Sequence, residues 1–325
     1  YSPAPGLAQL RDLIAAKLFK DNGLKYELSQ IVVSNGAKQS LFNAILAICS
    51  EGDEIIVPEP YWLSYPEMVR VAGGKTVTVP TSLENAFKMT PGDLEKAVTS
   101  RTRALILNTP SNPTGSAYTK EELQGICEVC VARDIYIISD EIYEKIIYEG
   151  MIHTSAGSLS ADVLAKTITV NGFSKSYAMT GWRLGYMAAP EEVAAACRGL
   201  QSHSTSGPNT FAQYGAIAAL TGSQSCLDER LTAFTERRDT LYERLNGIEG
   251  MKCFKPMGAF YMFPDISGFG IGSIEFAERL LDREKVALIP GMPFGSDSNV
   301  RLSYACSLDT INEAMDRIER FVASL

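Results

Sequence analysis

The sequence predicts an α/β fold with a mainly parallel sheet covered by helices on both faces, followed by a smaller α+β domain. Seven short apolar runs have the character of strands, and helical patterns lie between several of them; the runs are 31–34, 54–57, 76–79, 104–108, 135–139, 167–170 and 184–188. Such alternation is typical of a parallel sheet buried on both faces. From about residue 236 long helical patterns flank short strands at 259–263 and 300–304. We therefore expect a large domain over 1–235 and a small domain over 236–325.

The helices are predicted from apolar spacing. From Lys38 onward, Leu41, Ala44, Ile45 and Ile48 recur at intervals of three and four residues, as on one face of a helix. A second helical pattern covers 120–132.

Composition limits the function classes. The chain has 325 residues, 46% hydrophobic and 21% charged, with a net charge of -8, which is typical of a globular protein and disfavours nucleic acid or an anionic membrane as partner. No apolar stretch is long enough to span a bilayer, and no signal peptide is recognisable. Seven cysteines, scattered through apolar segments, favour a reducing compartment, the cytoplasm or, for a plant or algal chain, the plastid stroma. The opening segment Tyr1-Ser-Pro-Ala-Pro-Gly reads as a turn in mid-protein without an initiator methionine, so we expect residues upstream of it.

Unusual polar residues follow three of the expected strands. Asn112 follows 104–108, Asp140 follows 135–139 and Lys175 follows 167–170. In parallel sheets ligands bind beyond the carboxyl ends of the strands. We therefore expect these side chains to converge on one crevice.

The segment 170–183 contains the most informative residue. Lys175 lies among small residues, including Ser174 and Gly181, and Arg183 follows eight positions later. A lysine held by close-packed backbone loses water, which lowers its pKa and exposes a nucleophilic amine that can form a Schiff base. The local sequence leaves open which Schiff-base chemistry applies.

Asp140 and Tyr143 allow two interpretations. Asp140 could be a helix N-cap, or it could face a buried heterocyclic nitrogen and keep it protonated. Tyr143, three residues on, is expected on the same helical face, where it could donate to a neighbouring oxygen.

Three further positions are also ambiguous. The 34–38 segment with Gly36 and Ala37 is either a plain turn or an anion site at a helix start. Trp62 is either a core residue or a plane on which a flat cofactor stacks. Arg301 is either an exposed strand residue or a planar fork that binds a carboxylate. Asn112 lies between two prolines, which fix its side chain.

Together these motifs resemble the class I, fold type I pyridoxal-phosphate aminotransferases, and the resemblance runs from Tyr1 to the C-terminus. It is carried by the motifs at 34–39, 60–66, 108–115, 139–143, Ser174-Lys175 with Arg183, and 301–305. The residues of these motifs are most similar to those of the aspartate and prephenate aminotransferases of bacteria and plastids. The resemblance implies a seven-stranded sheet in a large cofactor domain, a homodimer, and an N-terminal segment that completes the small domain and that this sequence does not include.

The resemblance also implies roles around the ring of pyridoxal 5'-phosphate. Lys175 would form the Schiff base and then move a proton, and Asp140 would pair with the ring nitrogen. Tyr143 and Asn112 would hydrogen-bond the ring oxygen. Trp62 would stack on the ring and border the substrate.

For the phosphate, the resemblance implies the backbone of Gly36 and Ala37, the Ser174 hydroxyl and Arg183, with Tyr1 reaching across the dimer to the partner's phosphate. For the substrate, Arg301 with Asn112 would bind the α-carboxylate. Lys38, beside the cofactor, resembles the lysine that meets a distal carboxylate; otherwise it is a solvated lysine at a helix N-terminus, where a cation is mildly unfavourable.

The expected activity is transamination of aspartate, and of glutamate or prephenate, with 2-oxoglutarate or oxaloacetate. Alternatives are an aromatic or alanine specificity, β- or γ-elimination on the same cofactor, and a non-catalytic regulatory module. No metal site is expected, because Cys127 and Cys130 lie within a helical pattern and the chain has only two histidines.

Overall fold

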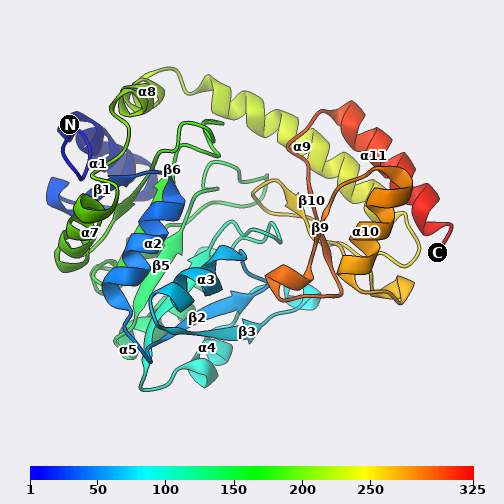
Figure 1. Cartoon of the computed structure of the whole chain (residues 1–325), viewed down its shortest axis with the longest axis horizontal. Coiled ribbons are helices and arrows are strands. Elements are labelled where there is room, and N and C mark those ends of the chain that lie inside the picture. The colour runs from blue at the N-terminus through cyan, green and yellow to red at the C-terminus, as the bar shows by residue number, and fades with distance from the viewer.

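The computed structural model describes all residues 1–325 and contains a seven-stranded sheet in the order β1-β7-β6-β5-β4-β2-β3 (Figure 1). The strands are β1 (Ile31–Ser34), β2 (Glu54–Glu59), β3 (Lys75–Pro80), β4 (Thr102–Asn108), β5 (Tyr136–Asp140), β6 (Thr167–Gly172) and β7 (Gly185–Ala188). Neighbours from β3 to β6 pair in parallel, and β7 runs antiparallel to both β6 and β1. The predicted mainly parallel α/β sheet is confirmed.

Helices cover both faces of this sheet. On one face lie α2 (Ala37–Ile48), α3 (Ser64–Val71) and α7 (Glu191–Ser204); on the other lie α1 (Ala8–Asn22), α4 (Pro91–Ala97), α5 (Lys120–Ala132), α6 (Ala161–Leu164) and α8 (Thr210–Thr221). Successive residues of a strand divide between the two layers: Ile106 of β4 packs in the first and Leu105 in the second. Helix α5 begins with a capping box in which Thr119 and Glu122 satisfy each other's backbone N–H groups.

A second, three-stranded sheet lies in the C-terminal part of the chain. Its strands are β8 (Tyr261–Met262), β9 (Ile289–Pro290) and β10 (Val300–Ser303), in the antiparallel order β8-β10-β9, packed with α10 (Ser273–Glu284) and α11 (Leu308–Val322). The long helix α9 (Ser225–Asn246) connects this part to the large sheet (Figure 1). The predicted domain boundary at 235/236 lies within α9, which continues across it. The boundary therefore stays a prediction.

Short 3₁₀ turns complete the secondary structure: Leu28–Gln30, Leu83–Asn85, Ala156–Ser158, Ser267–Phe269 and Met292–Phe294. No helix is both long and apolar enough to cross a membrane.

Two local expectations were wrong. The segment after Asp140 forms turns rather than a helix, because its backbone pairs with the C-terminal part of the chain: Ala259 N donates to Ile146 O and Tyr148 N to Met257 O. Strand β8 is shorter than the expected 259–263, since Ala259 has a φ of 57°, outside the strand region.

Candidate active site

A cavity of about 390 Å³ opens beyond the carboxyl ends of β4, β5 and β6, where the large sheet faces the small one. Residues from both parts of the chain line it: Ala37, Lys38, Leu41, Trp62, Tyr65, Asn108, Asn112, Asp140, Ile142, Tyr143, Ser174, Lys175, Thr180, Arg183, Tyr261 and Arg301. Every site residue expected from the sequence is in this lining except Gly36, which adjoins it, and Tyr1.

Lys175 follows β6 and is partly buried. Its Nζ lies 5.8 Å from the ring centre of Tyr143 and 5.6 Å from that of Phe260. Burial lowers the pKa of Lys175, and the positive charges of Arg301 and Arg183 add to this, while Asp140 opposes it. More of the amine is therefore unprotonated at neutral pH than in a solvated lysine.

Asp140 is the last residue of β5 and is buried. Tyr65 Oη donates to its Oδ2 at 2.6 Å, and the Ile142 N–H donates to its Oδ1 at 3.3 Å. Burial raises the pKa of Asp140 to about 6, against the effect of these two hydrogen bonds. At pH 7 about nine carboxyls in ten are then still ionised.

The hydroxyls of Tyr143 and Tyr261 lie 2.9 Å apart and share a hydrogen bond. Tyr143 belongs to the turn after β5, whereas Tyr261 belongs to β8. This pair therefore joins the two sheets at the cavity wall.

Arg301 of β10 has one nitrogen engaged and another without a partner. Its Nη1 donates to Asn112 Oδ1 at 2.8 Å, and its buried Nε has no hydrogen-bond partner. The guanidinium carbon lies 4.6 Å from the ring centre of Tyr261 and 4.9 Å from that of Phe294. The Asn112 N–H donates to Asn108 Oδ1 at 2.7 Å, which fixes the loop. A rigid cation with an unsatisfied donor is suited to a carboxylate.

Another part of the cavity wall is suited to an anion. Helix α2 begins at Ala37, and its N-cap Gly36 has a φ of 83° and supplies no side chain to the first N–H groups. A Cβ at Gly36 would lie 2.5 Å from Arg183 Nη2, so only glycine lets this guanidinium approach the helix start. Arg183 Nη1 donates to Thr180 O at 2.9 Å, and Ser174 lines the same region.

Trp62 and Lys38 lie together on the cavity wall. Lys38 Nζ is 4.8 Å from the centre of the Trp62 ring, and Trp62 packs edge-on against Tyr65 at 5.3 Å between ring centres. Trp62 is thus part of both the core layer and the cavity, so the two interpretations of this residue are compatible. Tyr1, at the start of the chain, is fully exposed and outside the cavity.

No role was predicted for four of the lining residues, Tyr65, Asn108, Thr180 and Tyr261. Tyr65 and Asn108 lie inside motifs that were recognised, so position within those motifs was the available signal. Tyr261 lies in an apolar run and reads as core.

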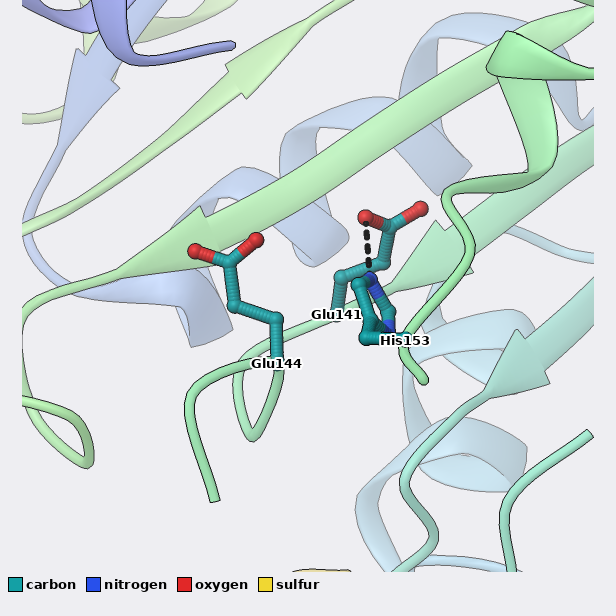
Figure 2. Close-up of side chains that lie close together, drawn as sticks. All are labelled: Glu141, Glu144 and His153. Atoms are coloured by element: carbon teal, nitrogen blue, oxygen red, sulfur yellow. Dashed lines mark hydrogen bonds and ion pairs between the residues drawn. The ribbon is translucent and has the colours of Figure 1, made fainter. Parts of the chain in front are cut away.

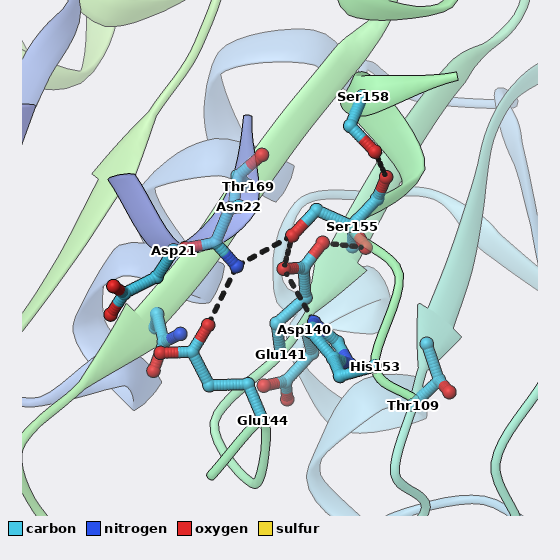
Figure 3. A network of polar contacts seen from close by, with 12 residues as sticks. Asp21, Asn22, Thr109, Asp140, Glu141, Glu144, His153, Ser155, Ser158 and Thr169 are labelled. Carbon is cyan, nitrogen blue, oxygen red and sulfur yellow. Dashed lines mark hydrogen bonds and ion pairs between the residues drawn. The ribbon is translucent and has the colours of Figure 1, made fainter. Parts of the chain in front are cut away.

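A buried polar network lies behind Asp140, on the other side of the turn. Glu141, Glu144 and His153 each place one ligand-type atom within 4.8 Å of the others (Figure 2). Glu141 Oε2 accepts from Ser155 Oγ at 2.6 Å and contacts His153 Nε2 at 3.1 Å (Figure 3). Its Oε1 accepts from Ser139 Oγ at 2.8 Å.

The other carboxylate of this network is bound to helix α1. Glu144 Oε2 accepts from Asn22 Nδ2 at 2.7 Å (Figure 3). Glu144 Oε1 is paired with Lys17. All four carboxylate oxygens of Glu141 and Glu144 therefore have partners within the protein, and the network fixes the turn that carries Asp140 and Tyr143.

Comparison with known proteins identifies the family. The family described as aminotransferase class I and II matches residues 1–318. The chain belongs to this family. Its members depend in general on pyridoxal phosphate and transfer amino groups between amino acids and 2-oxo acids.

Among curated relatives of this aminotransferase chain is an aspartate aminotransferase of Bacillus subtilis, 50% identical over 99% of the chain and 83% of the relative. An aspartate/prephenate aminotransferase of Cereibacter sphaeroides is 43% identical over 100% and 84%. Among solved structures, the aspartate aminotransferase of Thermus thermophilus with maleate has a TM-score of 0.95 at 43% identity, covering 99% of the chain and 83% of that structure. An aromatic aminotransferase of Pyrococcus horikoshii has a TM-score of 0.97 at 41% identity over 100% and 88%.

Proposed function

We propose that this chain uses pyridoxal 5'-phosphate to transfer the amino group of aspartate to 2-oxoglutarate, with glutamate and prephenate as further substrates of the same site. The observation that carries the proposal is that Lys175, Asp140 and Arg301 line one cavity. A nucleophilic amine, a buried carboxylate and a carboxylate-binding cation are the groups that amino-acid transamination requires.

The cavity fits the cofactor on its own chemistry. A buried carboxylate, Asp140, is available to a ring nitrogen, and Trp62 offers a plane. The start of α2, Ser174 and Arg183 form a cradle for a phosphate. When bound, pyridoxal phosphate supplies a conjugated ring that withdraws electrons from the amino acid Cα.

The side chains then have separable tasks. Lys175, with its lowered pKa, would take the proton from Cα and deliver it to C4′ of the cofactor, the transfer that transamination requires. Asp140 holds a proton on the ring nitrogen through a charge-assisted hydrogen bond. Arg301 and Asn112 bind the α-carboxylate, with the guanidinium already oriented by the hydrogen bond from Arg301 Nη1 to Asn112 Oδ1. Tyr143 can turn its hydroxyl from Tyr261 to the ring oxygen.

The position of Lys38 in the cavity favours a substrate with two carboxylates. The cavity lining has four basic side chains, of which Lys175, Arg183 and Arg301 already have tasks. Lys38, over the Trp62 ring, is the remaining cation for a second carboxylate. The names of the Bacillus and Cereibacter relatives agree with this assignment.

We propose a homodimer in a reducing compartment, the cytoplasm or the plastid stroma. Trp182, Phe211 and Tyr214 are exposed, and Trp182 packs against α8, the helix that carries the other two. In such a dimer Tyr1 is proposed to contact the partner's phosphate, as the resemblance to class I aminotransferases implies. All seven cysteines are free, which fits a reducing compartment. Light scattering at several concentrations would measure the mass.

The test is to supply the purified chain with pyridoxal phosphate, aspartate and 2-oxoglutarate and to measure glutamate and oxaloacetate. We expect both products, and we expect Lys175→Ala to abolish them while keeping its unfolding midpoint. Release of ammonia or pyruvate without glutamate would instead assign an elimination reaction. Cofactor binding without turnover of any amino acid, alanine and aromatic substrates included, would assign a regulatory module.

A further inference from the structure

Tyr65 makes a single side-chain hydrogen bond, and its partner is Asp140. The phenol lies in α3, is 1% exposed, and donates to Asp140 Oδ2 at 2.6 Å. Buried hydroxyls usually have a hydrogen-bond partner, and here the partner is the Asp140 carboxylate. If the ring served only for packing, the hydroxyl would not be needed. The contact therefore points to a role connected with Asp140.

The remaining contacts of Asp140 come from the backbone or hold its backbone. Ile142 N–H donates to Oδ1 at 3.3 Å, while Asn108 Nδ2 and Thr109 N–H donate to the Asp140 carbonyl at 3.0 and 3.2 Å. The last two bonds fix the main chain of Asp140. Tyr65 is the one side chain that donates to the carboxylate, so it determines how Oδ2 is oriented.

The charged and titratable groups around Asp140 act in opposite directions. Glu141, on the same turn, disfavours a negative charge on Asp140, whereas Lys175, after β6, favours it. Burial raises the pKa of the Tyr143 phenol, in the same turn, and the negative charge of Asp140 adds to this. Burial is the largest influence and favours the neutral acid. The hydrogen bond that Tyr65 donates favours the ionised carboxylate and so opposes the effect of burial on the pKa of Asp140.

The same phenol ring also supports Trp62. The two rings pack edge-on at 5.3 Å with an interplanar angle of 85°. Tyr65 therefore touches both the residue expected beside the cofactor ring and the residue expected at its nitrogen.

We propose that Tyr65 is a positioning residue that aims the Asp140 carboxylate at the ring nitrogen of the cofactor and keeps that carboxylate ionised. This inference rests on the proposed function for the identity of the ring. The hydrogen bond itself is a property of the protein without ligand.

The first measurement uses the protein without cofactor. In protein labelled with ¹³C at the aspartate carboxyls, the Asp140 signal is identified by its loss in Asp140→Asn, and its titration is compared between wild type and Tyr65→Phe. We expect the midpoint to rise by about one pH unit in Tyr65→Phe, because a hydrogen bond to a charged group is lost. Tyr61→Phe is the matched control, since Tyr61 is a nearby, partly buried tyrosine outside the cavity lining, and should leave the midpoint unchanged.

The second measurement is the affinity for pyridoxal phosphate, followed by absorbance at pH 7. We expect Tyr65→Phe to bind about tenfold more weakly than wild type. In the Asp140→Asn background the same change should cost almost nothing, since the residue acts through Asp140. A purely structural role for Tyr65 would lower affinity equally in both backgrounds.

An unchanged Asp140 titration in Tyr65→Phe, or an equal loss of affinity in both backgrounds, would overturn the inference. If the wild type binds no pyridoxal phosphate, the proposed function fails, and the titration still decides whether Tyr65 controls Asp140. Circular dichroism and unfolding midpoints verify that each variant is folded.

Discussion

Replacing Lys17 by Met tests the buried network behind the active site. Lys17 lies on α1, and its ammonium pairs with Glu144 in the turn that follows Asp140 and Tyr143. Both side chains are largely buried, at 11% and 5% exposed. Methionine retains most of the aliphatic stem, so the substitution removes a charge with little loss of packing.

The magnitude follows from the pKa of Glu144. Burial raises this pKa, but the charge of Lys17, followed by His153 and the hydrogen bonds of Lys17 and Asn22, outweighs burial and lowers it from 4.5 to about 2. A depression of about 2.5 units corresponds to roughly 3 kcal/mol of stability, which is also the usual cost of leaving a buried charge unpaired. Because the folded pKa is depressed, this stability is fully present above about pH 4.5 and is lost as the pH falls toward 2.

The assay is urea unfolding of wild type and Lys17→Met at several values from pH 7 to pH 3. We expect Lys17→Met to lower the free energy of unfolding by about 3 kcal/mol at pH 7, with a difference that shrinks as the solution is acidified. Lys145→Met is the matched control, because Lys145 joins the same turn to Asp21 of α1 at 2.7 Å but with side chains 30% and 24% exposed. The control should cost less than about 1 kcal/mol. Equal losses in the two variants, or a difference independent of pH, would refute the reasoning.

Three further predictions concern the cavity and the cysteines. Arg301→Lys should raise the KM for aspartate roughly tenfold or more with a smaller change in kcat, since it loses the planar fork, and an unchanged KM would remove Arg301 from the carboxylate site. Lys38→Met should lower kcat/KM for aspartate about tenfold and leave that for alanine nearly unchanged, whereas equal losses would exclude a distal-carboxylate role. A thiol reagent at pH 8 should modify the partly exposed Cys226 first, and Cys127 and Cys197 only after unfolding, because burial raises the pKa of each of the last two to about 12. Mass spectrometry locates the label, and early labelling of Cys127 would contradict the buried helix.

The fold was largely predictable because hydrophobic periodicity marks buried strands and helices. All seven expected strands are present, and the helix expected over 120–132 has those bounds. The direction of β7 was not predictable from periodicity, which is the same for parallel and antiparallel strands. Its antiparallel pairing follows from the segment between β6 and β7, which contains no crossover helix.

The candidate site was predictable where polar residues follow strands. Asn112, Asp140 and Lys175 line one cavity because the carboxyl ends of parallel strands meet at one edge. The turn after Asp140 was wrongly assigned to a helix, since its pairing partners Met257 and Ala259 are more than a hundred residues away. Local sequence carries no signal for such a contact.

The network of Glu141, Glu144 and Lys17 was also not predictable from the sequence. The two glutamates flank Tyr143 in sequence, but the partners of Glu144 lie on α1, at the start of the chain. Two charged residues close together usually indicate a solvated surface, and only the tertiary arrangement shows them to be buried.

Two side-chain hydrogen bonds at the cavity wall, each joining the two parts of the chain, have a thermodynamic consequence. Arg301 and Tyr261 belong to the small sheet, whereas their partners Asn112 and Tyr143 follow strands of the large one. Any rotation of one sheet against the other would separate these pairs and dismantle the carboxylate-binding site. A substrate that binds through Arg301 and Asn112 therefore has its highest affinity for one relative arrangement of the two sheets, and by mass action it draws the population toward that arrangement. Recognition of the substrate and assembly of the cavity are in this way a single equilibrium.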